Sequence, residues 1–267
     1  MYQTHWGLRE TPFRTCLDPR FFYQSPTHDE ALARLQFLVE QHRRLGVLIG
    51  DTGSGKSLLL EVFAEQMRRG GRPVAKVNLR GLAPEELLWA LVSSLGLNPD
   101  RGERLPSLWR MLADRLAEHR YQQLETVVLL DDADQAAPDV LAQVTRLAGS
   151  DYSPESRLTI VLTGCQAQIG RLGRSLLEMA ELRIDVEPWE ASDTEDYLRH
   201  SLSRAGRENP VFDEPAVRRL HELTHGIPRR VSQLANLALL AGAGRELDRV
   251  DAEVVESAFH ELGVIEV

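Results

Sequence analysis

One eight-residue stretch, GDTGSGKS at residues 50–57, constrains the fold more than any other feature of this sequence. It directly follows the apolar run LGVLI and directly precedes LLLEVFAEQM, in which apolar residues recur at helical spacing. Glycine tolerates backbone angles and close contacts that other residues do not. The stretch therefore predicts a tight loop between a buried strand and a helix.

The same stretch matches the pattern G-x-x-x-x-G-K-[ST], which binds phosphate chains when it lies between a strand and a helix. Loop amides and the following helix N-terminus offer hydrogen-bond donors and a favourable dipole to phosphate. Lys56 would pair with the β and γ phosphates, and the Ser57 hydroxyl would hold Mg²⁺. The residues predicted to bind ATP are Gly50, Asp51, Thr52, Gly53, Ser54, Gly55, Lys56, Ser57 and Leu58. The alternative, a flexible glycine turn that ends in a solvated lysine, is disfavoured by the strand and helix on either side.

A second feature, TVVLLDDADQ at residues 126–135, has the pattern of an apolar strand that ends in adjacent carboxylates. Proteins with such a phosphate loop use a strand-end aspartate for the metal ion. We predict that Asp131 holds Mg²⁺ through water and that Asp132 polarises the attacking water. The alternative is that Asp131, Asp132 and Asp134 only cap the next helix.

Five short runs rich in β-branched and apolar residues predict strands. They are VLIG at 47–50, VAKVNLR at 74–80, TVVLLDD at 126–132, RLTIVLTG at 157–164 and LRIDVEP at 182–188. Amphipathic helical patterns lie between them. Near-continuous apolar strands that alternate with helices indicate an α/β fold with a mostly parallel five-stranded sheet covered on both faces.

After Trp189 the pattern changes to helices alone. The helix-like segments are SDTEDYLRHSLSRAG, DEPAVRRLHELTHG, PRRVSQLANLALLAGAG and DAEVVESAFHELG. We therefore predict two domains: residues 1–190, which include an N-terminal helical element and the phosphate loop, and residues 191–267, a small all-α domain.

Composition limits the class of protein. A formal net charge of −9 over 267 residues argues against attraction of the whole molecule to nucleic acid, but not against a local basic patch. No run approaches the length of a membrane span, and the N-terminus lacks the layout of a secretory signal. We expect a cytoplasmic protein without direct membrane insertion. The two cysteines belong to no Cys/His cluster, which argues against a zinc site.

Several segments occur together in a set order. They are YQTHWGLRETPFR, DPRFFYQSPTHDEALARL, the loop at 50–57, LLDDADQ, RLTIVLTGCQAQ, GIPRRVSQLANLALLAGAG and DAEVVESAF. In this order they resemble the AAA+ ATPases of the general secretion pathway protein A type, also called ExeA-like, over nearly the whole chain. The resemblance implies a RecA-like P-loop core of three α/β/α layers followed by a small all-α lid domain, with ATP between them. Family members of this type serve secretion and pilus systems, and relatives of the same shape serve DNA transposition.

The resemblance also implies roles for three residues outside the phosphate loop. By position, Thr163 is the sensor that orients the water or the γ-phosphate, Arg229 is the lid arginine that reaches the nucleotide, and His28 flanks the adenine. Without the resemblance, Arg229 would be interpreted as a solvated residue at a helix start.

Two departures from the family pattern bear on hydrolysis. The family has Asp-Glu-Ala where this chain has Asp-Asp-Ala, so the candidate base Asp132 is one methylene shorter. The family also carries an arginine shortly before the fifth strand that suits a neighbour's γ-phosphate. Here the nearest cation is Arg183 inside the strand, and Arg171 and Arg174 are alternatives. Because an arginine supplied in trans is worth about three to five orders of magnitude in turnover, slow hydrolysis stays open.

These patterns together predict a Mg²⁺-dependent ATP-binding and ATP-hydrolysing AAA+ protein that energises or regulates a secretion- or pilus-type assembly. Its expected partners are a nucleotide, further copies of itself in an ATP-dependent homo-oligomer, and a protein of the assembly, through which any contact with the inner membrane is made. The predicted catalytic residues are Lys56, Asp132, Thr163 and Arg229. Two alternatives remain: an ATP-dependent DNA-binding regulator of the transposition type, with slender support from GIPRR, and a slow or degenerate nucleotide switch.

Overall fold

The computed structural model describes residues 2–100, 102–150, 153 and 155–262. The chain divides into two compact units. The first contains Met1–Asp29, Gly53–Gly55 and Glu187–Val267, and the second contains Glu30–Thr52 and Lys56–Val186. The domain boundary inferred at residue 190 stays a prediction. The compact units differ from it in joining the first 29 residues and the middle of the glycine-rich loop to the C-terminal helices.

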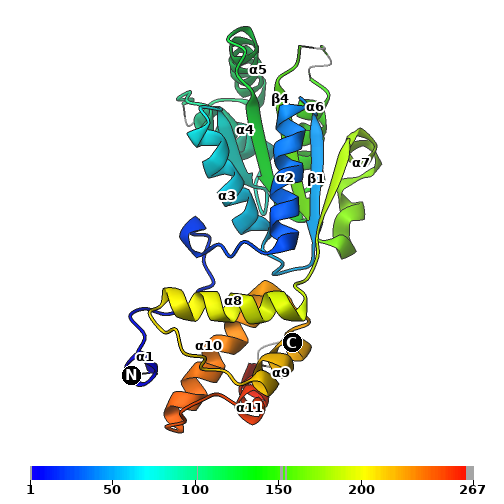
Figure 1. Ribbon diagram of the computed structural model, residues 1–267. Coiled ribbons are helices and arrows are strands. Elements are labelled where there is room, and N and C mark those ends of the chain that lie inside the picture. The colour runs from blue at the N-terminus through cyan, green and yellow to red at the C-terminus, as the bar shows by residue number, and fades with distance from the viewer. Residues whose placement is uncertain (1, 101, 151–152, 154, 263–267) are drawn as a thin grey trace. The chain divides into compact units, whose positions relative to one another are not determined.

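The second unit is built on a five-stranded sheet (Figure 1). Its strands are β1 (Leu45–Gly50), β2 (Val74–Asn78), β3 (Thr126–Asp131), β4 (Leu158–Gly164) and β5 (Leu182–Val186). They lie in the order β2-β3-β4-β1-β5, and every pairing is parallel. Strands β1, β3 and β4 are buried along their whole length, which explains why they are near-continuous apolar runs in the sequence. The predicted α/β class and parallel sheet are confirmed.

Helices cover both faces of this sheet. They are α2 (Pro26–Glu40), which begins in the first unit, α3 (Lys56–Arg69), α4 (Pro84–Ser94), α5 (Leu105–Tyr121), α6 (Pro138–Ala148) and α7 (Arg174–Met179). Alternate β1 residues Leu45, Val47 and Ile49 pack in one hydrophobic cluster with α4, α5, α6 and α7. On the opposite face, Gly46 leaves room for Leu38 of α2, which is drawn beside β1 in Figure 1. The second unit therefore has three layers.

The first unit is helical. Its elements are α1 (Tyr2–Trp6), the short 3-10 turn η1 (Pro19–Phe21), α8 (Ala191–Arg204), α9 (Glu214–Thr224), α10 (Pro228–Gly244) and α11 (Ala252–Leu262). The N-terminal segment belongs here because its apolar side chains Trp6, Leu8 and Phe13 enter the same hydrophobic core as α8 to α11. The Trp6 Nε1 atom donates to the Leu239 carbonyl at 2.9 Å, which ties α1 to α10.

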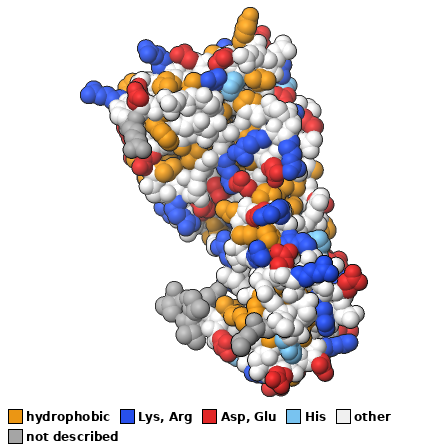
Figure 2. All heavy atoms as spheres, turned by 90° about the vertical axis from the view of Figure 1, so that its left-hand side faces the viewer, with side chains coloured by type: hydrophobic (Ala, Val, Ile, Leu, Met, Phe, Trp, Pro, Cys, Tyr) orange, Lys and Arg blue, Asp and Glu red, His pale blue; other side chains and the backbone are white. Residues whose placement is uncertain are grey.

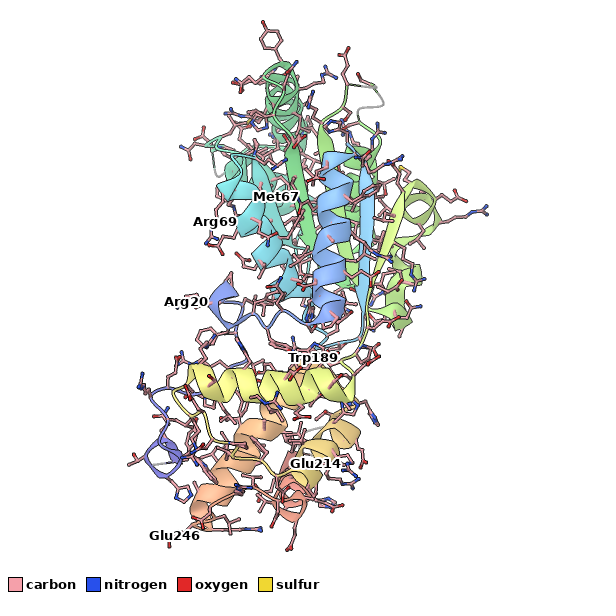
Figure 3. All side chains as sticks on the ribbon, in the orientation of Figure 1. Arg20, Met67, Arg69, Trp189, Glu214 and Glu246 are labelled. Atoms are coloured by element: carbon pink, nitrogen blue, oxygen red, sulfur yellow. The ribbon has the colours of Figure 1, made fainter. Side chains whose placement is uncertain are left out.

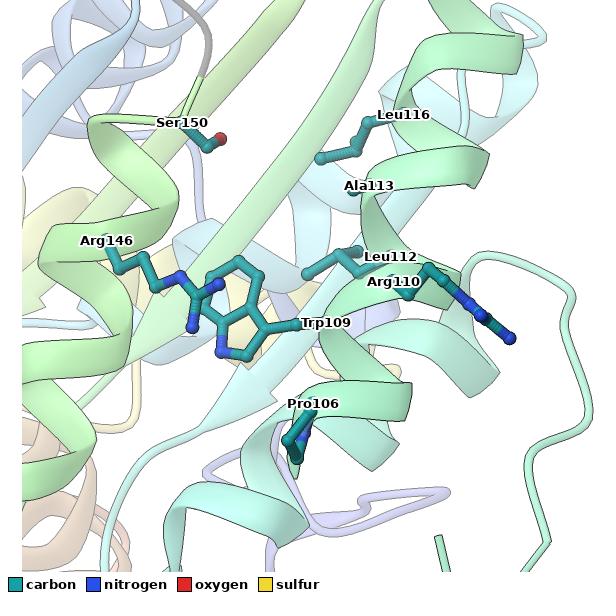
Figure 4. Close-up of a pocket in the computed structure, with 8 residues that line it drawn as sticks. All are labelled: Pro106, Trp109, Arg110, Leu112, Ala113, Leu116, Arg146 and Ser150. Carbon is teal, nitrogen blue, oxygen red and sulfur yellow. The ribbon is translucent and has the colours of Figure 1, made fainter. Parts of the chain in front are cut away.

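A cavity of about 310 Å³ lies between α5 and α6 in the second unit (Figure 4). The Arg146 guanidinium stacks over the Trp109 ring at 4.3 Å from its centroid, and Trp109 Nε1 donates to Gln143 Oε1 at 2.9 Å. None of the cavity's lining residues is a predicted site residue. Within the described residues, none of the helices is long and apolar enough to span a bilayer.

Candidate functional site

The middle of the glycine-rich loop is shaped by two glycines with positive φ, +90° at Gly53 and +96° at Gly55. These residues count with the first unit, where two contacts hold them. The Arg229 backbone N–H donates to the Gly53 carbonyl at 3.1 Å, and His28 Nε2 lies 3.0 Å from the Ser54 carbonyl. A Cβ atom on Gly55 would lie 2.9 Å from His28 Nε2. Both the backbone angles and the close contacts therefore require glycine.

Lys56 follows the loop as the first residue of α3, in the second unit. Its Nζ donates to the carbonyls of Gly50 and Asp51 at 2.7 and 2.9 Å, so the side chain folds back over the loop. The side chain is largely buried, and this burial lowers the pKa of Lys56. The nearby thiol of Cys165 and acidic side chains of β3 and its following turn act in the opposite direction on that pKa.

Asp131 and Thr163 meet at the carboxyl ends of the adjacent strands β3 and β4. The Thr163 hydroxyl donates to Asp131 Oδ1 at 2.6 Å and accepts the backbone N–H of Asp132 at 2.9 Å. Asp131 is 3% exposed and Thr163 is fully buried. One hydroxyl therefore orients the candidate metal-binding carboxylate and the backbone of the candidate base together.

The Asp132 carboxylate is held by residues from the end of β2. Asn78 Nδ2 donates to Asp132 Oδ2 at 2.9 Å, and Arg80 Nη2 pairs with the same oxygen at 3.4 Å. Asp132 itself has φ +53°, in the left-handed region that aspartate tolerates better than most residues. Sequence patterns indicated neither partner, because the contact depends on β2 lying next to β3. In the sequence, the one indication of these partners was that the predicted second strand contains the polar residue Asn78 near its end.

The helix-capping alternative for the three aspartates has no support in the structure. The N-cap residue of α6 is Ala137, and Asp132 makes no capping hydrogen bond to the 3-10 turn that follows it. Asp134 is buried and accepts the backbone N–H of Cys165 at 3.1 Å. These carboxylates instead contact strand ends and the turn after β4.

The remaining predicted residues fall into two groups. Ser57 and Leu58 are in the first turn of α3, half-buried, and Thr52 Oγ1 lies 4.0 Å from Cys165 Sγ. Arg229 and His28 belong to the first unit, whereas Lys56 and the strand-end residues belong to the second. In the part of the chain that the structure describes, there is no cluster of three His, Cys, Asp or Glu side chains that could hold a metal ion.

The candidate cations for a neighbouring site differ in their pairing. Arg183 binds Asp185 through two nitrogens and also donates to Gln166 Oε1 at 2.8 Å. Arg174 pairs with Glu178 on its own helix. Arg171 forms no ion pair with any described residue, so its side chain is the least committed of the three.

Comparison with known proteins gives a consistent result. A family model described as AAA domain matches residues 39–172. The chain is 28% identical over 269 residues to general secretion pathway protein A of Aeromonas hydrophila, in an alignment that covers 99% of this chain and 49% of that protein. The chain thus spans about half the length of this relative. Both findings confirm the resemblance predicted from the motifs.

Solved structures share the fold. The Aeropyrum pernix ORC1 protein in complex with DNA superposes with a TM-score of 0.67 at 21% identity, covering 91% of this chain and 67% of that one. The Thermotoga maritima RuvB Holliday junction branch migration motor gives a TM-score of 0.62 at 14% identity, with 95% and 74% covered. At these identities the likeness concerns the fold alone. It confirms the RecA-like P-loop core with a helical C-terminal part.

Proposed function

Because the chain belongs to the AAA domain family, we propose that it binds ATP together with Mg²⁺ and hydrolyses the ATP. The observation that carries the proposal is the buried Lys56 at the start of α3 in the same unit as the Asp131–Thr163 contact. The contact lies at the carboxyl ends of β3 and β4, and Lys56 follows the carboxyl end of β1. Open α/β sheets bind their ligands at this edge.

The described residues fit an anionic ligand, and Asp131 and Ser57 offer the oxygen donors that Mg²⁺ takes beside substrate phosphates. The Ser54 hydroxyl is buried and has no hydrogen-bond partner, and the backbone N–H groups of Ser54 and Gly55 donate to no described residue. Such orphaned donors are costly unless a ligand or water accepts from them. In this proposal Ser57 and Asp131 would hold the Mg²⁺, which would neutralise charge on the β and γ phosphates.

The protein's own groups have separate roles in the proposal. The Lys56 ammonium exchanges its hydrogen bonds to the Gly50 and Asp51 carbonyls for hydrogen bonds to the phosphates. Charged phosphate oxygens are stronger acceptors for an ammonium group than neutral carbonyls. Asp132 orients the attacking water, and Thr163 fixes Asp131 and Asp132 through its hydroxyl. Arg229 contributes a cation, and the position of its side-chain carbons next to Gly53 of the loop supports that role.

The experiment is ATP hydrolysis per molecule over a wide range of protein concentration, with ATP affinity measured beside it. We expect Lys56→Ala to lose ATP binding. Asp132→Asn is expected to retain binding and lose turnover, because asparagine tolerates the left-handed backbone but is not a base. Activity per molecule that rises with concentration would support a homo-oligomer whose site is completed by a second copy. Normal ATP binding by Lys56→Ala would refute the proposal.

The similarity to general secretion pathway protein A supports a further step. We propose that the ATPase acts through a protein partner in a secretion- or pilus-type assembly. Turnover is then expected to rise when purified components of such an assembly are added. Unchanged turnover, with no co-sedimentation of any component, would contradict this step.

A second candidate is nucleotide-dependent DNA binding. It is favoured by Arg229 and Arg230, which are exposed at the start of α10, and by the fold shared with an ORC1 protein solved in complex with DNA. The net charge of −9 weighs against it, and acidic side chains lie among the basic ones on the face shown in Figure 2. DNA binding in the ATP state that weakens steeply with salt would support this candidate, and its absence at low salt would remove it.

A further inference from the structure

His28 is a buried histidine with both ring nitrogens engaged. Its side chain is 3% exposed, Nδ1 lies 2.8 Å from Ser25 Oγ, and Nε2 lies 3.0 Å from the Ser54 carbonyl. A carbonyl oxygen only accepts, so Nε2 carries the proton and Nδ1 accepts from the Ser25 hydroxyl. Both nitrogens of the neutral ring therefore have hydrogen-bond partners within the protein, and neither is free to form a hydrogen bond with an adenine.

Further hydrogen bonds extend this contact into a closed ring within the first unit. Trp189, just before α8 in Figure 3, donates its indole N–H to Ser25 Oγ at 3.0 Å. The backbone N–H of Trp189 donates to the Gly226 carbonyl at 2.9 Å. Three residues after Gly226, the backbone N–H of Arg229 reaches the Gly53 carbonyl. The loop residues Gly53 and Ser54 are thus held from two sides, and both sides meet at Trp189.

These two contacts determine where the loop's own N–H groups point. A trans peptide is planar, so its C=O and the next N–H point in opposite directions. Holding the Gly53 carbonyl fixes the direction of the Ser54 N–H, and holding the Ser54 carbonyl fixes that of the Gly55 N–H. Both of these N–H groups donate to no described residue.

We propose that His28 is a positioning residue for the phosphate-binding loop, and that with Ser25 and Trp189 it aims the Ser54 and Gly55 N–H groups at the phosphates of the nucleotide. The inference deepens the proposed function and rests on it for the identity of the ligand. It assigns His28 to the loop backbone, in place of the adenine contact that the family resemblance implies.

The test compares two substitutions of His28. His28→Gln keeps an amide donor near the position of Nε2, whereas His28→Leu keeps bulk and removes the donor. His119→Leu is the matched control, because His119 is also buried and its Nδ1 also lies 2.9 Å from a hydroxyl, that of Thr126 in the second unit. Ser25→Ala is a milder variant that leaves His28 in place and removes its Nδ1 partner.

Two quantities are measured: the affinity for Mg·ATP, and hydrogen exchange of the amides at residues 53–57 in the nucleotide-free protein. We expect His28→Leu to weaken affinity about tenfold, as loss of one buried hydrogen bond predicts, and to speed exchange in the loop. His28→Gln should restore most of both, Ser25→Ala should lie between, and His119→Leu should change neither.

The two readouts separate this inference from the proposed function. If the wild-type chain binds no ATP, the proposed function fails, and faster loop exchange in His28→Leu alone would still support the positioning role. Wild-type affinity and exchange in His28→Leu would overturn it. Equal losses in the Gln and Leu variants would also overturn it, because packing and not the hydrogen bond would then be responsible.

Discussion

The carboxylate of Asp132 uses one oxygen, Oδ2, for both of its partners, Asn78 and Arg80. A carboxylate tied to an arginine is less free to orient a water molecule. The Arg80 side chain is 68% exposed, so the ion pair is worth about 0.2–1 kcal/mol. Arg80→Ala is therefore expected to raise the rate of ATP hydrolysis by up to about fivefold, since 1 kcal/mol corresponds to that factor. Steady-state turnover at saturating ATP measures the effect.

Arg69→Ala is the control for this prediction. Arg69 is a similarly exposed arginine that pairs with Glu65 on its own helix, away from the strand ends. Its loss should leave turnover unchanged. If Arg80→Ala lowers turnover instead, then Arg80 assists catalysis and Asp132 is not restrained by it.

Two buried histidines give the protein a predictable response to pH. Burial is the main cause that lowers the pKa of both His28 and His119. At His28 the hydrogen bond to the Ser54 carbonyl opposes this shift, followed by the charges of Asp29 and Asp193. At His119 the charge of Arg115 adds to the shift and that of Glu118 opposes it. The unfolded chain therefore takes up protons at a higher pH than the folded chain. The contribution of these two histidines to the free energy of unfolding is fully present above about pH 6.5. It decreases as the pH drops toward their folded-state pKa values, by up to about 1.4 kcal/mol per pH unit for each group.

Urea denaturation between pH 5 and pH 8 checks this response. His28→Gln and His119→Gln should each make the pH dependence shallower. His260→Gln, which changes an exposed histidine, should not. A pH dependence that is equally steep in all three variants would show that other groups cause it.

At the scale of elements, Gly226 joins the turn before α10 to the segment before α8. It has φ +66°, and a Cβ atom placed on it would collide with the backbone oxygen of Trp189. Gly71 has a similar φ of +75° but open space around it. Gly71→Ala should cost about 1–2 kcal/mol of unfolding free energy from backbone strain alone. Gly226→Ala should cost clearly more, about 3 kcal/mol or above, because the backbone must also shift.

Chemical denaturation of the two variants side by side separates strain from collision. Equal losses would mean that the contact between Trp189 and Gly226 relaxes without cost. In that case the ring of hydrogen bonds around the phosphate loop would be easily remodelled.

The strands were predictable because each is an apolar run that ends in a turn or a polar residue. The structure extends the first of them to Leu45 and shortens the other four by one or two residues each. β2 ends at Asn78, whose side-chain oxygen accepts the Arg80 N–H at 2.9 Å and turns the chain. The helices α6 and α7 had not been identified as separate elements. The close approach of α2 to β1 was also not predictable, since it depends on Leu38 packing where Gly46 has no side chain.

The candidate site was predictable only where neighbours in space are neighbours in sequence. The glycine-rich loop, Lys56 and the pair Asp131–Asp132 lie within single motifs. The family resemblance implied a sensor role for Thr163, but its contact with Asp131 was not predicted, because it joins residues on two strands that are 32 positions apart in the sequence. Asn78 and Arg80 were missed because strand order, which places β2 beside β3, cannot be inferred from local pattern.

At the scale of the whole molecule, the chain and its proposed ligand ATP are both negatively charged. A chain with net charge −9 does not attract an anion such as ATP at long range. Affinity must therefore come from local groups, namely the loop amides and the buried ammonium of Lys56. A ligand that binds only the folded chain raises its stability by about 2.7 kcal/mol when present at 100 times its dissociation constant.

This linkage gives a prediction for the intact protein. Saturating Mg·ATP should raise the midpoint of thermal unfolding by about 5–10 °C for a chain of this size, and Lys56→Ala should abolish the shift. Asp132→Asn should keep it, because that residue is proposed to act on water and not on binding. A shift of equal size in Lys56→Ala would mean that the nucleotide stabilises the protein from a different site. The phosphate loop would then not be the ATP-binding site, and the proposed function would fail in this form even if the chain hydrolyses ATP.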